Sequence, residues 1–391
     1  MGGERAGELT LLVAEHYERA GEPALAAERL RVAGEAALRV GAYDEALATL
    51  HRARDLVTAP EHLRVRAEVT LNMGEVLGQT GRYQEVQDLL EPMLPDLRRS
   101  GDLKHLARTL GHLGRIGVWR DDPGPTRVYL SEALEVARET GDEPGLMFLL
   151  RQLGNISLHD IEKAEAYFEE SLTLARRLGD KISEASALNG MGNLMQVAGR
   201  MAESSEWFRQ AQAAAIEVKN SFLSTMTNVN LAENFIWQGD FSKGRALLES
   251  AIERIRELGE EGMLPGVIMD LGWADVRAGN LAQARKHLAD SLVRHRQQGV
   301  TPLIPLAMFA LLEAKKGNRE TALEWMGLVR AQPTLQPAAA DFFVRPDWNE
   351  MTAGLSPAEV DAALARGAKG SLPELLKQLE SQGQEVGTAG T

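Results

Sequence analysis

A small residue returns about every 40 positions along this chain of 391 residues. The small positions are Gly34, Gly74, Gly114, Gly154, Gly192, Ala232, Gly272 and Ala310. A fixed period of this length is typical of a solenoid, in which each helical hairpin buries its apolar face only against its neighbours. The chain is therefore expected to be all-α and to be built from antiparallel helix pairs with repeats of about 40 residues.

A helix-breaking turn follows most of the small positions by seven residues, and another small residue often follows the turn by five, as at Ala46, Ser204 and Gly244. We call the helix before this turn helix A and the helix after it helix B. Two helices that cross at close range leave no room for a side chain, so we expect each small position to mark an A–B crossing. The predicted turn residues are Gly41, Gly81, Asp121, Gly199, Gly239, Gly279 and Gly317.

A second glycine, 27 residues after the small position in most units, is expected to end helix B in a left-handed conformation. These glycines are Gly101, Gly141, Gly259 and Gly299.

Three segments depart from the period. The unit between Gly154 and Ala164 is two residues short, which predicts a change in the twist of the superhelix there. Pro92 and Pro95 are expected to kink or break helix B of their unit. After about residue 331 the period stops, and the Pro- and Ala-rich residues 331–343 are predicted to form a connector.

These departures predict three regions: a lead-in helix over residues 1–22, a repeat array over 23–331, and a C-terminal helical cap with a tail over 332–391. Within the cap, short helices are expected at 356–366 and 372–381. Disorder is expected from Gln382 onward.

The composition excludes several classes of protein. The chain has no cysteine, so disulfides and thiolate metal sites are impossible. Its net charge of −13 argues against a general attraction to nucleic acid or anionic lipid. No run of apolar residues is long enough to span a membrane, and the first residues lack a signal-peptide pattern. These features predict a cytoplasmic protein that does not bind nucleic acid or membranes directly.

No motif indicates catalysis. The eight histidines form no metal-ligand spacing. His105 and His112 share a helix, but the sequence shows no convincing carboxylate partner for either, so solvated or capping histidines are expected. Residues 190–193 (GMGN) lie inside a predicted helix A and lack the strand that a dinucleotide-binding turn needs. We therefore expect no enzymatic activity, no cofactor and no metal.

Over residues 23–331, the pattern of each unit resembles the tetratricopeptide repeat. This pattern consists of a small residue, a turn glycine, a large residue two positions after the turn and a small residue five positions after it. The large residues are Tyr43, Tyr83, Phe241 and Leu281. The units here are longer than the usual 34 residues. The resemblance implies a right-handed superhelix whose A helices line a concave face, which in this family often clamps extended peptides.

A narrower resemblance concerns both ends of the chain. Residues 9–56 and 354–376 are similar to segments of bacterial signal-transducing ATPase regulators of the STAND type, in which the repeat array is the sensor. The chain lacks the GxxxxGK[ST] phosphate loop of such proteins, because residues 367–371 (GAKGS) do not have its spacing. The resemblance thus implies a sensor portion that works with an ATPase module outside this sequence, or a free-standing relative.

The candidate ligand groove follows from helical geometry. Positions three before, one after and four after the small residue share one stripe of helix A. In the third to fifth units this stripe carries a basic and amide patch, with Trp273 as an apolar wall further along beside Ile236 and Met269. Arginine offers a planar fork for a carboxylate or phosphate, and the amides suit a peptide backbone. The patch residues are Arg115, Arg151, Asn155, Asn189, Asn193 and Gln196.

The same polar residues could instead be solvated or paired with neighbouring glutamates. The favoured function is a protein- or peptide-binding sensor domain of a bacterial signalling or transcription regulator. The alternatives are a free-standing scaffold that assembles partner proteins and a small-molecule receptor. The receptor would have a closed apolar pocket walled by Trp273 and Met269.

Overall fold

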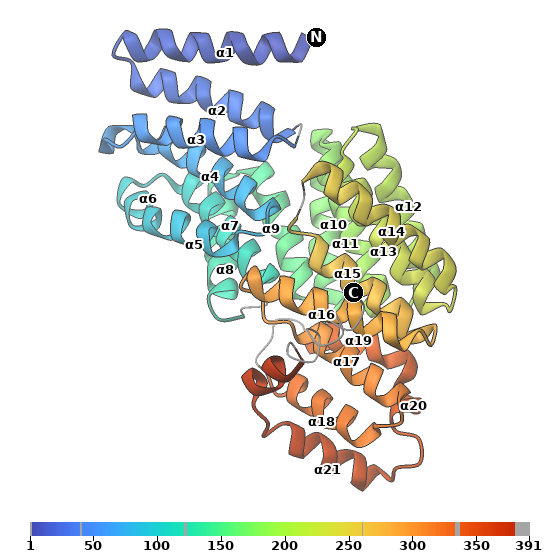
Figure 1. The fold of residues 1–391 in the computed structure, drawn as a ribbon. Coiled ribbons are helices and arrows are strands. Elements are labelled where there is room, and N and C mark those ends of the chain that lie inside the picture. Colours follow the sequence, from blue (N-terminus) through green and yellow to red (C-terminus); the bar gives the residue numbers. More distant parts are fainter. Residues whose placement is uncertain (1, 40, 121–122, 260, 333–336, 380–391) are drawn as a thin grey trace. The chain divides into compact units, whose positions relative to one another are not determined.

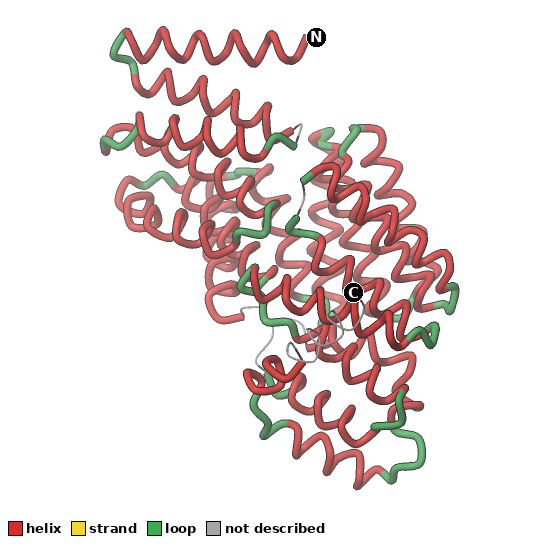
Figure 2. The backbone as a smooth tube through the Cα atoms, in the orientation of Figure 1, coloured by secondary structure: helices red, strands yellow, loops and turns green. Residues whose placement is uncertain are grey.

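The computed structural model describes residues 2–39, 41–120, 123–259, 261–332 and 337–379, and every regular element in these ranges is a helix (Figures 1 and 2). Successive helices pack as antiparallel pairs, so the expected all-α fold of helical hairpins is confirmed. The predicted turn at Asp121 and the predicted disorder from Gln382 fall outside the described residues.

The chain divides into two compact units, and each is described by itself. Unit 1 comprises Met1–Arg120, Gly124–Gln152 and Arg256–Gly262. Unit 2 comprises Asp121–Pro123, Leu153–Ile255 and Met263–Thr391. The boundary at Gln152 and Leu153 lies directly before the repeat that the sequence shows to be two residues short.

The first part of the chain carries the helices that make up most of unit 1. They are α1 (Gly2–Arg19), α2 (Pro23–Arg39), α3 (Tyr43–Leu56), η1 (Pro60–His62), α4 (Leu63–Gln79), α5 (Tyr83–Leu90), η2 (Glu91–Met93), α6 (Leu94–Ser100), α7 (Leu103–Trp119), α8 (Pro123–Thr140) and α9 (Glu143–Ile156).

The second part carries the helices that make up most of unit 2. They are α10 (Ile161–Leu178), α11 (Lys181–Val197), α12 (Met201–Glu217), α13 (Ser221–Trp237), α14 (Phe241–Leu258), α15 (Leu264–Arg277), α16 (Leu281–Gln297), α17 (Leu303–Lys315), α18 (Arg319–Arg330), α19 (Pro337–Val344), η3 (Arg345–Asp347), α20 (Trp348–Met351) and α21 (Pro357–Gly367). Residues 372–379 are also helical.

The small positions are the points where helix A and helix B cross. A Cβ atom added at Gly192 would lie 2.3 Å from the ring of Phe208, which is fully buried sixteen residues later on helix B. Leu50, Leu90, Leu130 and Leu288 meet Gly34, Gly74, Gly114 and Gly272 in the same way, again sixteen residues later. These contacts confirm why the period demands a small residue: a large apolar side chain from helix B occupies the space.

The shortened repeat keeps this contact with a different spacing. Phe168 follows Gly154 by fourteen residues, and a Cβ at Gly154 would lie 2.6 Å from its ring. The same ring would lie 2.3 Å from a Cβ at Gly190 on the next helix A. The missing residues come from the end of α9, which stops at Ile156, two residues after Gly154, whereas α11 continues for five residues after Gly192 to Val197. The crossing itself is preserved.

The turns between helices use left-handed backbone at fixed places. Gly179 at the end of α10 has φ +70°, and the equivalent position 40 residues later is Lys219, with φ 57°. Lys219 is the one described residue other than glycine with positive φ. The aspartates after Gly101 and Gly179 cap the next helix, since Asp102 and Asp180 accept hydrogen bonds from backbone N–H groups of its first turn.

Proline acts as expected in one place and differently in another. Helix B after α4 is broken into α5, η2 and α6 around Pro92 and Pro95, as predicted. The connector predicted over residues 331–343 is wrong in its second half, where α19 forms. A proline at the first position of a helix costs no hydrogen bond, and Phe342 and Phe343 gain burial in the core of unit 2.

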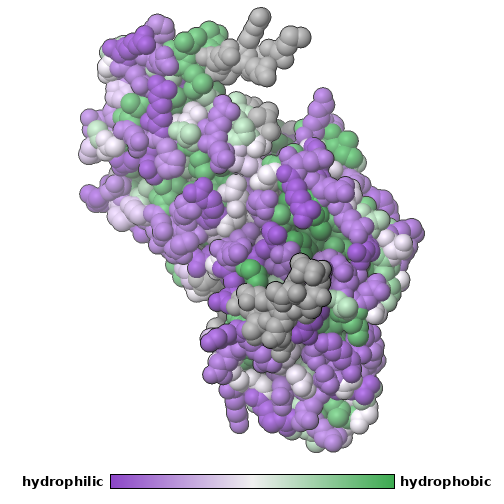
Figure 3. Space-filling view, in the orientation of Figure 1, coloured by the Kyte–Doolittle hydropathy of each residue, from purple (hydrophilic) through white to green (hydrophobic). Residues whose placement is uncertain are grey.

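The surface agrees with the acidic composition. On the face drawn in Figure 3, hydrophilic residues cover most of the area and apolar residues form smaller patches. Within the described ranges, none of the helices is long and apolar enough to cross a membrane.

We expect the substitution Gly192→Ala to destabilise the protein by roughly 1–3 kcal/mol, because the added methyl group would collide with Phe208 and force the two helices apart. Gly266→Ala is the matched control, since nothing lies within 4 Å of a Cβ built at Gly266. This control should stabilise the protein by about 0.5–1 kcal/mol through helix propensity. Urea unfolding followed by circular dichroism measures both, and equal effects would contradict the crossing contact.

Candidate functional site

Arg115 and Arg151, which we call the arginine pair, lie on the A helices α7 and α9 of unit 1 and share one aromatic ring. Their guanidinium carbons are 5.7 and 5.4 Å from the centre of the Phe148 ring. Arg115 is 8% exposed, and its Nη2 donates a hydrogen bond of 2.6 Å to Oε2 of Glu75 on α4. The structure thus brings together two predicted arginines over a phenylalanine that the prediction did not include.

The two arginines differ in their partners. Although burial opposes the charge of Glu75, Arg115 lowers the pKa of that carboxyl to about 2, so the carboxylate is committed to Arg115. Arg151 is half-buried and has no hydrogen bond or ion pair to any described residue. Burial, helped by the positive charge of Arg115, lowers the pKa of Arg151 to about 10. Arg151 therefore remains a cation at neutral pH without a matching anion.

Two further groups belong to this part of unit 1. His112 stacks on Phe148 with ring centres 5.3 Å apart, and burial together with Arg115 lowers the pKa of the imidazole to about 3. Gln152, next to Arg151, is buried, and its side-chain Nε2 has no hydrogen-bond partner in the described structure. The site therefore holds a neutral histidine and two donor groups, Arg151 and Gln152, that lack an acceptor.

In unit 2 the predicted amides form a hydrogen-bonded network between α11 and α13, which we call the amide ladder. Asn230 Nδ2 donates to Oδ1 of Asn189 at 2.9 Å and to Oδ1 of Asn193 at 3.1 Å. Gln196 Nε2 donates to the backbone oxygen of Asn230 at 3.1 Å and to Oδ1 of Asn234 at 3.0 Å. The members are Asn189, Asn193, Gln196, Asn230 and Asn234.

The remaining predicted residue of the patch, Asn155, lies on α9 within unit 2. It is half-buried and makes no hydrogen bond to a described residue. The arginine pair and the amide ladder belong to different units, so each is treated as a site of its own. The alternative that these polar groups pair with neighbouring glutamates holds for Arg115 with Glu75 and for Gln196, whose Nε2 lies 3.2 Å from Glu233 Oε2.

One periodic contact explains the ladder. It joins two successive A helices. The residue two positions before the small residue of one repeat contacts the residue one position after the small residue of the preceding repeat. Asn72 Nδ2 donates to Glu35 Oε1 at 2.8 Å in unit 1, as Asn230 does to Asn193 in unit 2. Asn230 lies two positions before its small residue, outside the predicted stripe, which begins three positions before it. A polar residue recurs two positions before the small residue, at Asn72, His112, Gln152, Asn230 and Asp270, and could have shown it.

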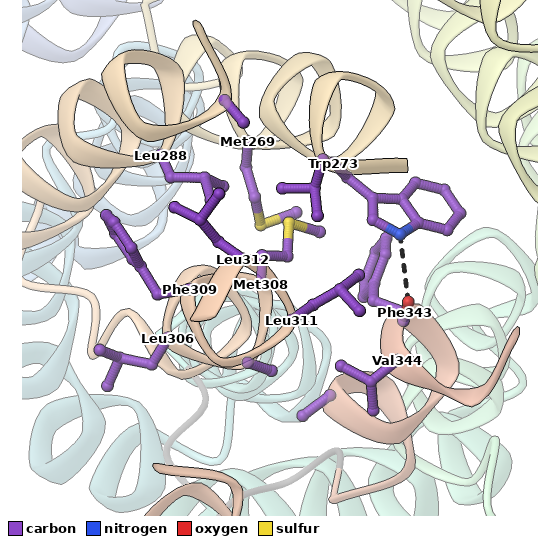
Figure 4. Close-up of a cluster of buried hydrophobic side chains, with 14 of the residues drawn as sticks. Met269, Trp273, Leu288, Leu306, Met308, Phe309, Leu311, Leu312, Phe343 and Val344 are labelled. Atoms are coloured by element: carbon purple, nitrogen blue, oxygen red, sulfur yellow. Dashed lines mark hydrogen bonds between the residues drawn. The ribbon is translucent and has the colours of Figure 1, made fainter. Parts of the chain in front are cut away.

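Trp273 does not lie on an open surface. It is fully buried, and its Nε1 donates a hydrogen bond of 3.1 Å to the backbone oxygen of Phe343 (Figure 4). Its ring also packs against Phe342 and Phe343, with centres 6.3 and 5.1 Å apart. Because α19 already fills the space beside Trp273, we leave this residue out of the proposed binding surface.

The segment 337–351, which we call the cap segment, crosses the ends of successive A helices of unit 2. Arg345 Nη1 donates to the backbone oxygen of Val197 at the end of α11. The ring of Phe342 lies 6.3 Å from that of Trp237 at the end of α13. Asp347 forms ion pairs with Arg277 of α15 at 3.0 Å and with Lys315 of α17 at 3.2 Å. The cap segment therefore contacts the last residues of α11, α13, α15 and α17, whereas Asn189 and Asn230 of the amide ladder lie near the middle of α11 and α13.

His105 corrects an expectation. Its Nδ1 lies 2.7 Å from Asp102 Oδ2 and its Nε2 lies 3.0 Å from Glu68 Oε1, so the side chain is neither solvated nor without carboxylate partners. Burial disfavours the charged imidazole, but the two carboxylates outweigh burial and raise the pKa of His105. The hydrogen bond from His105 also lowers the pKa of Glu68 to about 2. Glu68 lies 37 residues before His105, on a different helix A, so its approach could not be read from the sequence around His105.

A search of the described residues for groups of three or more histidine, aspartate and glutamate side chains that could hold a metal found none.

Comparisons with known proteins agree with this architecture. Residues 155–217 match the tetratricopeptide repeat family. No curated protein sequence matches the chain. A solved Rap protein in complex with Competence and Sporulation Factor is 14% identical, with a TM-score of 0.56 over 82% of this chain and 91% of that chain.

Two other solved structures are similar to the chain. One is a STAND protein with a tetratricopeptide repeat sensor from Pyrococcus horikoshii, 15% identical, with a TM-score of 0.46 over 96% of this chain and 54% of that one. The other is aspartyl phosphate phosphatase F from Bacillus subtilis, 11% identical, with a TM-score of 0.46 over 90% and 94% of the two chains. At these identities the likeness concerns the fold alone.

The His105 contacts predict a pH-dependent stability. A histidine whose pKa is raised by folding stabilises the folded state fully below its unfolded pKa, near 6.5, and loses this effect as the pH rises through the folded pKa. The melting temperature of the wild-type protein should exceed that of His105→Gln most at about pH 6, and the difference should shrink as the pH rises above 6.5 through the folded pKa. Thermal melts from pH 5.5 to 9 test this, and a difference that stays constant would contradict it.

The arginine pair predicts a contrast in stability. Arg115→Gln leaves the carboxylate of Glu75 without its cation and should cost about 2–4 kcal/mol. Arg151→Gln removes a half-buried cation that has no carboxylate partner, so the free energy of unfolding should stay the same or rise. Chemical unfolding of the two variants side by side measures this, and a similar loss in both would show that Arg151 has a structural role.

Proposed function

Taking the chain as a tetratricopeptide-repeat protein, we propose that it is a protein-interaction module that binds an extended peptide or protein segment along its A helices. In this proposal it acts, without catalysis, as the sensor of a bacterial signalling or transcription regulator. The observation that carries the proposal is Arg151, a half-buried guanidinium over Phe148 without a described anionic partner.

A buried charge is costly unless it is paired, and Arg115 already uses the nearest carboxylate. A carboxylate or phosphate of a ligand would supply the missing charge, and the guanidinium of Arg151 can bind it in a bidentate way. Gln152 could donate a further hydrogen bond to the same group through its buried Nε2. The arginine pair is thus suited to an acidic side chain or a terminal carboxylate of a bound segment.

The amide ladder, a separate site in unit 2, suits the backbone of a bound segment. Each amide side chain presents both a donor and an acceptor, which is what an extended peptide needs for its own N–H and C=O groups. Asn193 and Asn155 are only half-buried, so their remaining hydrogen-bonding capacity is within reach of a ligand. Hydrogen bonds from Asn230 hold Asn189 and Asn193 in place, so this part of the surface is organised before a ligand arrives.

The sensor role rests on the resemblance of residues 9–56 and 354–376 to STAND regulators, and it implies an ATPase module as a partner. The Rap protein that shares the fold was solved with Competence and Sporulation Factor bound, which is consistent with ligand binding by such an array. A free-standing scaffold is the alternative, and an ATPase in the same reading frame would distinguish the two. The small-molecule receptor is not favoured, because Phe342 and Phe343 fill the place of its predicted pocket.

Affinity capture followed by measurement of the dissociation constant tests the binding proposal. Partners retained by the wild-type chain from a lysate of the source organism are identified, and their binding segments are synthesised. Arg151→Gln should weaken binding of the segment by roughly 10–150-fold, the value of one charged hydrogen-bonding interaction. Asn155→Ala combined with Asn193→Ala should weaken it as well, without a change in helical content.

The matched control is Arg127→Gln, which removes an exposed arginine from the B helix α8 and leaves the net charge equal to that of Arg151→Gln. Binding should remain at the wild-type level in this control. Equal affinity of the wild type, Arg151→Gln and the asparagine variant would overturn the A-helix surface as the binding site.

A further inference from the structure

The periodic contact between successive A helices joins two acidic residues at one place, between α13 and α15. Glu233 on α13 lies one position after the small residue Ala232, and Asp270 on α15 lies two positions before the small residue Gly272. The equivalent contacts join an amide to an acid at Asn72 and Glu35, and two amides at Asn230 and Asn193. At Glu233 and Asp270, two carboxyl groups meet where the pattern otherwise provides a donor, and a hydrogen bond joins them.

The two carboxyl groups, which we call the acid pair, are poorly satisfied. Asp270 is 2% exposed, and its Oδ1 has no hydrogen-bond partner in the described structure. Glu233 is half-buried and accepts a hydrogen bond of 3.2 Å from Gln196 of the amide ladder. Burial raises the pKa of Glu233 to about 7, and burial together with Glu233 holds the pKa of Asp270 well above its usual value. The free protein thus keeps a proton on the pair near neutral pH.

Nearby cations do not compensate the pair. On α15 itself, Arg277 is engaged with Asp347 and with the backbone oxygen of Ile236. On the packed helices, Lys315 of α17 binds Asp347 and Glu350, and Arg245 of α14 binds Asp275. The group that faces Glu233 from α11 is the neutral amide of Gln196. Among the described residues, no cation contributes to the charge state of either carboxyl.

There is also room beside the pair. Gly266 lies one helical turn before Asp270 on the same side of α15, and a Cβ built there would meet nothing within 4 Å. Most other glycines inside A helices are filled by a neighbouring side chain, as Gly192 is by Phe208. The orphaned oxygen of Asp270 and the open space at Gly266 are independent signs that another group can enter here.

We propose that the acid pair is a subsite for a guanidinium or ammonium group of a basic side chain in the bound segment. This inference rests on the proposed function, since it specifies the charge of one residue of the ligand. The incoming cation replaces the shared proton, which is released to solvent, and it supplies the hydrogen-bond donors that Asp270 Oδ1 lacks. A segment that carries lysine or arginine at this point is therefore selected over one that carries a neutral residue.

The test uses small probes on the whole chain, so it does not depend on knowing the ligand. N-acetyl-argininamide, N-acetyl-lysinamide and N-acetyl-citrullinamide are titrated into the protein while the side-chain carboxyl carbons of Glu233 and Asp270 are followed by NMR. The two cationic probes should shift these signals with a saturable dependence, and the neutral citrulline probe should not. The stronger of the two cationic probes identifies the side chain that the subsite prefers.

Binding should also release protons. Because the cation displaces a proton, the affinity of the argininamide probe should rise by up to tenfold per pH unit below about pH 7 and level off above it. Calorimetry of the wild-type protein in buffers with different ionisation enthalpies measures the number of protons released. At pH 6, a value near one supports the proposal, and a value of zero contradicts it without any variant being needed.

Substitutions provide the second arm. Glu233→Gln and Asp270→Asn should each weaken binding of the argininamide probe at least tenfold, while Glu253→Gln, an exposed position on α14 with the same change in charge, should have no effect. If Asp270→Asn fails to fold, Glu233→Gln and the proton count still decide the outcome. Binding of citrullinamide as strong as that of argininamide would overturn the subsite and leave the prediction for Arg151 in unit 1 untouched.

Discussion

The contact on which the rest of this structure depends is the insertion of one large apolar side chain of helix B into the space left by a small residue of helix A. Phe208 over Gly192 and Leu288 over Gly272 are examples, and in each a Cβ on helix A would lie closer than 3 Å to the inserted side chain. A solenoid has no single core, so each repeat must hold its own hairpin together. The shortened repeat retains the contact between Phe168 and Gly154, which shows that the chain tolerates a shorter helix A more readily than a change in the crossing.

This crossing also determines what faces outward from the A helices. Because a small residue faces helix B, the residues two positions before it and one position after it lie on the opposite side of helix A. There, the residue two before contacts the residue one after the small residue of the preceding helix A. Asn72 with Glu35 and Asn230 with Asn193 are such contacts. The array thus produces a row of polar side chains that are held by one another. Arg151, three positions before its small residue, lies outside this rule and has no described anionic partner. The acid pair follows the rule but joins two acids where the other contacts include a donor.

The C-terminal residues limit which part of that row can bind. α19 packs Phe342 and Phe343 against Trp273, and Asp347 joins the ends of α15 and α17 through two ion pairs. These residues close the apolar end of the helices in unit 2, as an end unit of a solenoid must. Asn189, Asn230 and Asp270 lie near the middle of their helices, away from these end contacts, and this is the part that we propose for a partner.

The spacing of small residues determined the helical hairpins, their turns, and the placement of Arg115, Arg151, Asn189 and Asn193 on A helices. The two prolines determined the break at Pro92 and Pro95. These features are local, because helical periodicity and steric exclusion at a crossing act within one repeat. Only the tertiary structure decided that Arg115 pairs with Glu75 while Arg151 does not, that Glu233 and Asp270 meet, and that α19 buries Trp273. Those outcomes join residues about 40 or 70 positions apart, and their energies depend on burial and on the identity of the facing side chain. A helical period shows which face a residue occupies, but not which charge or ring arrives opposite it.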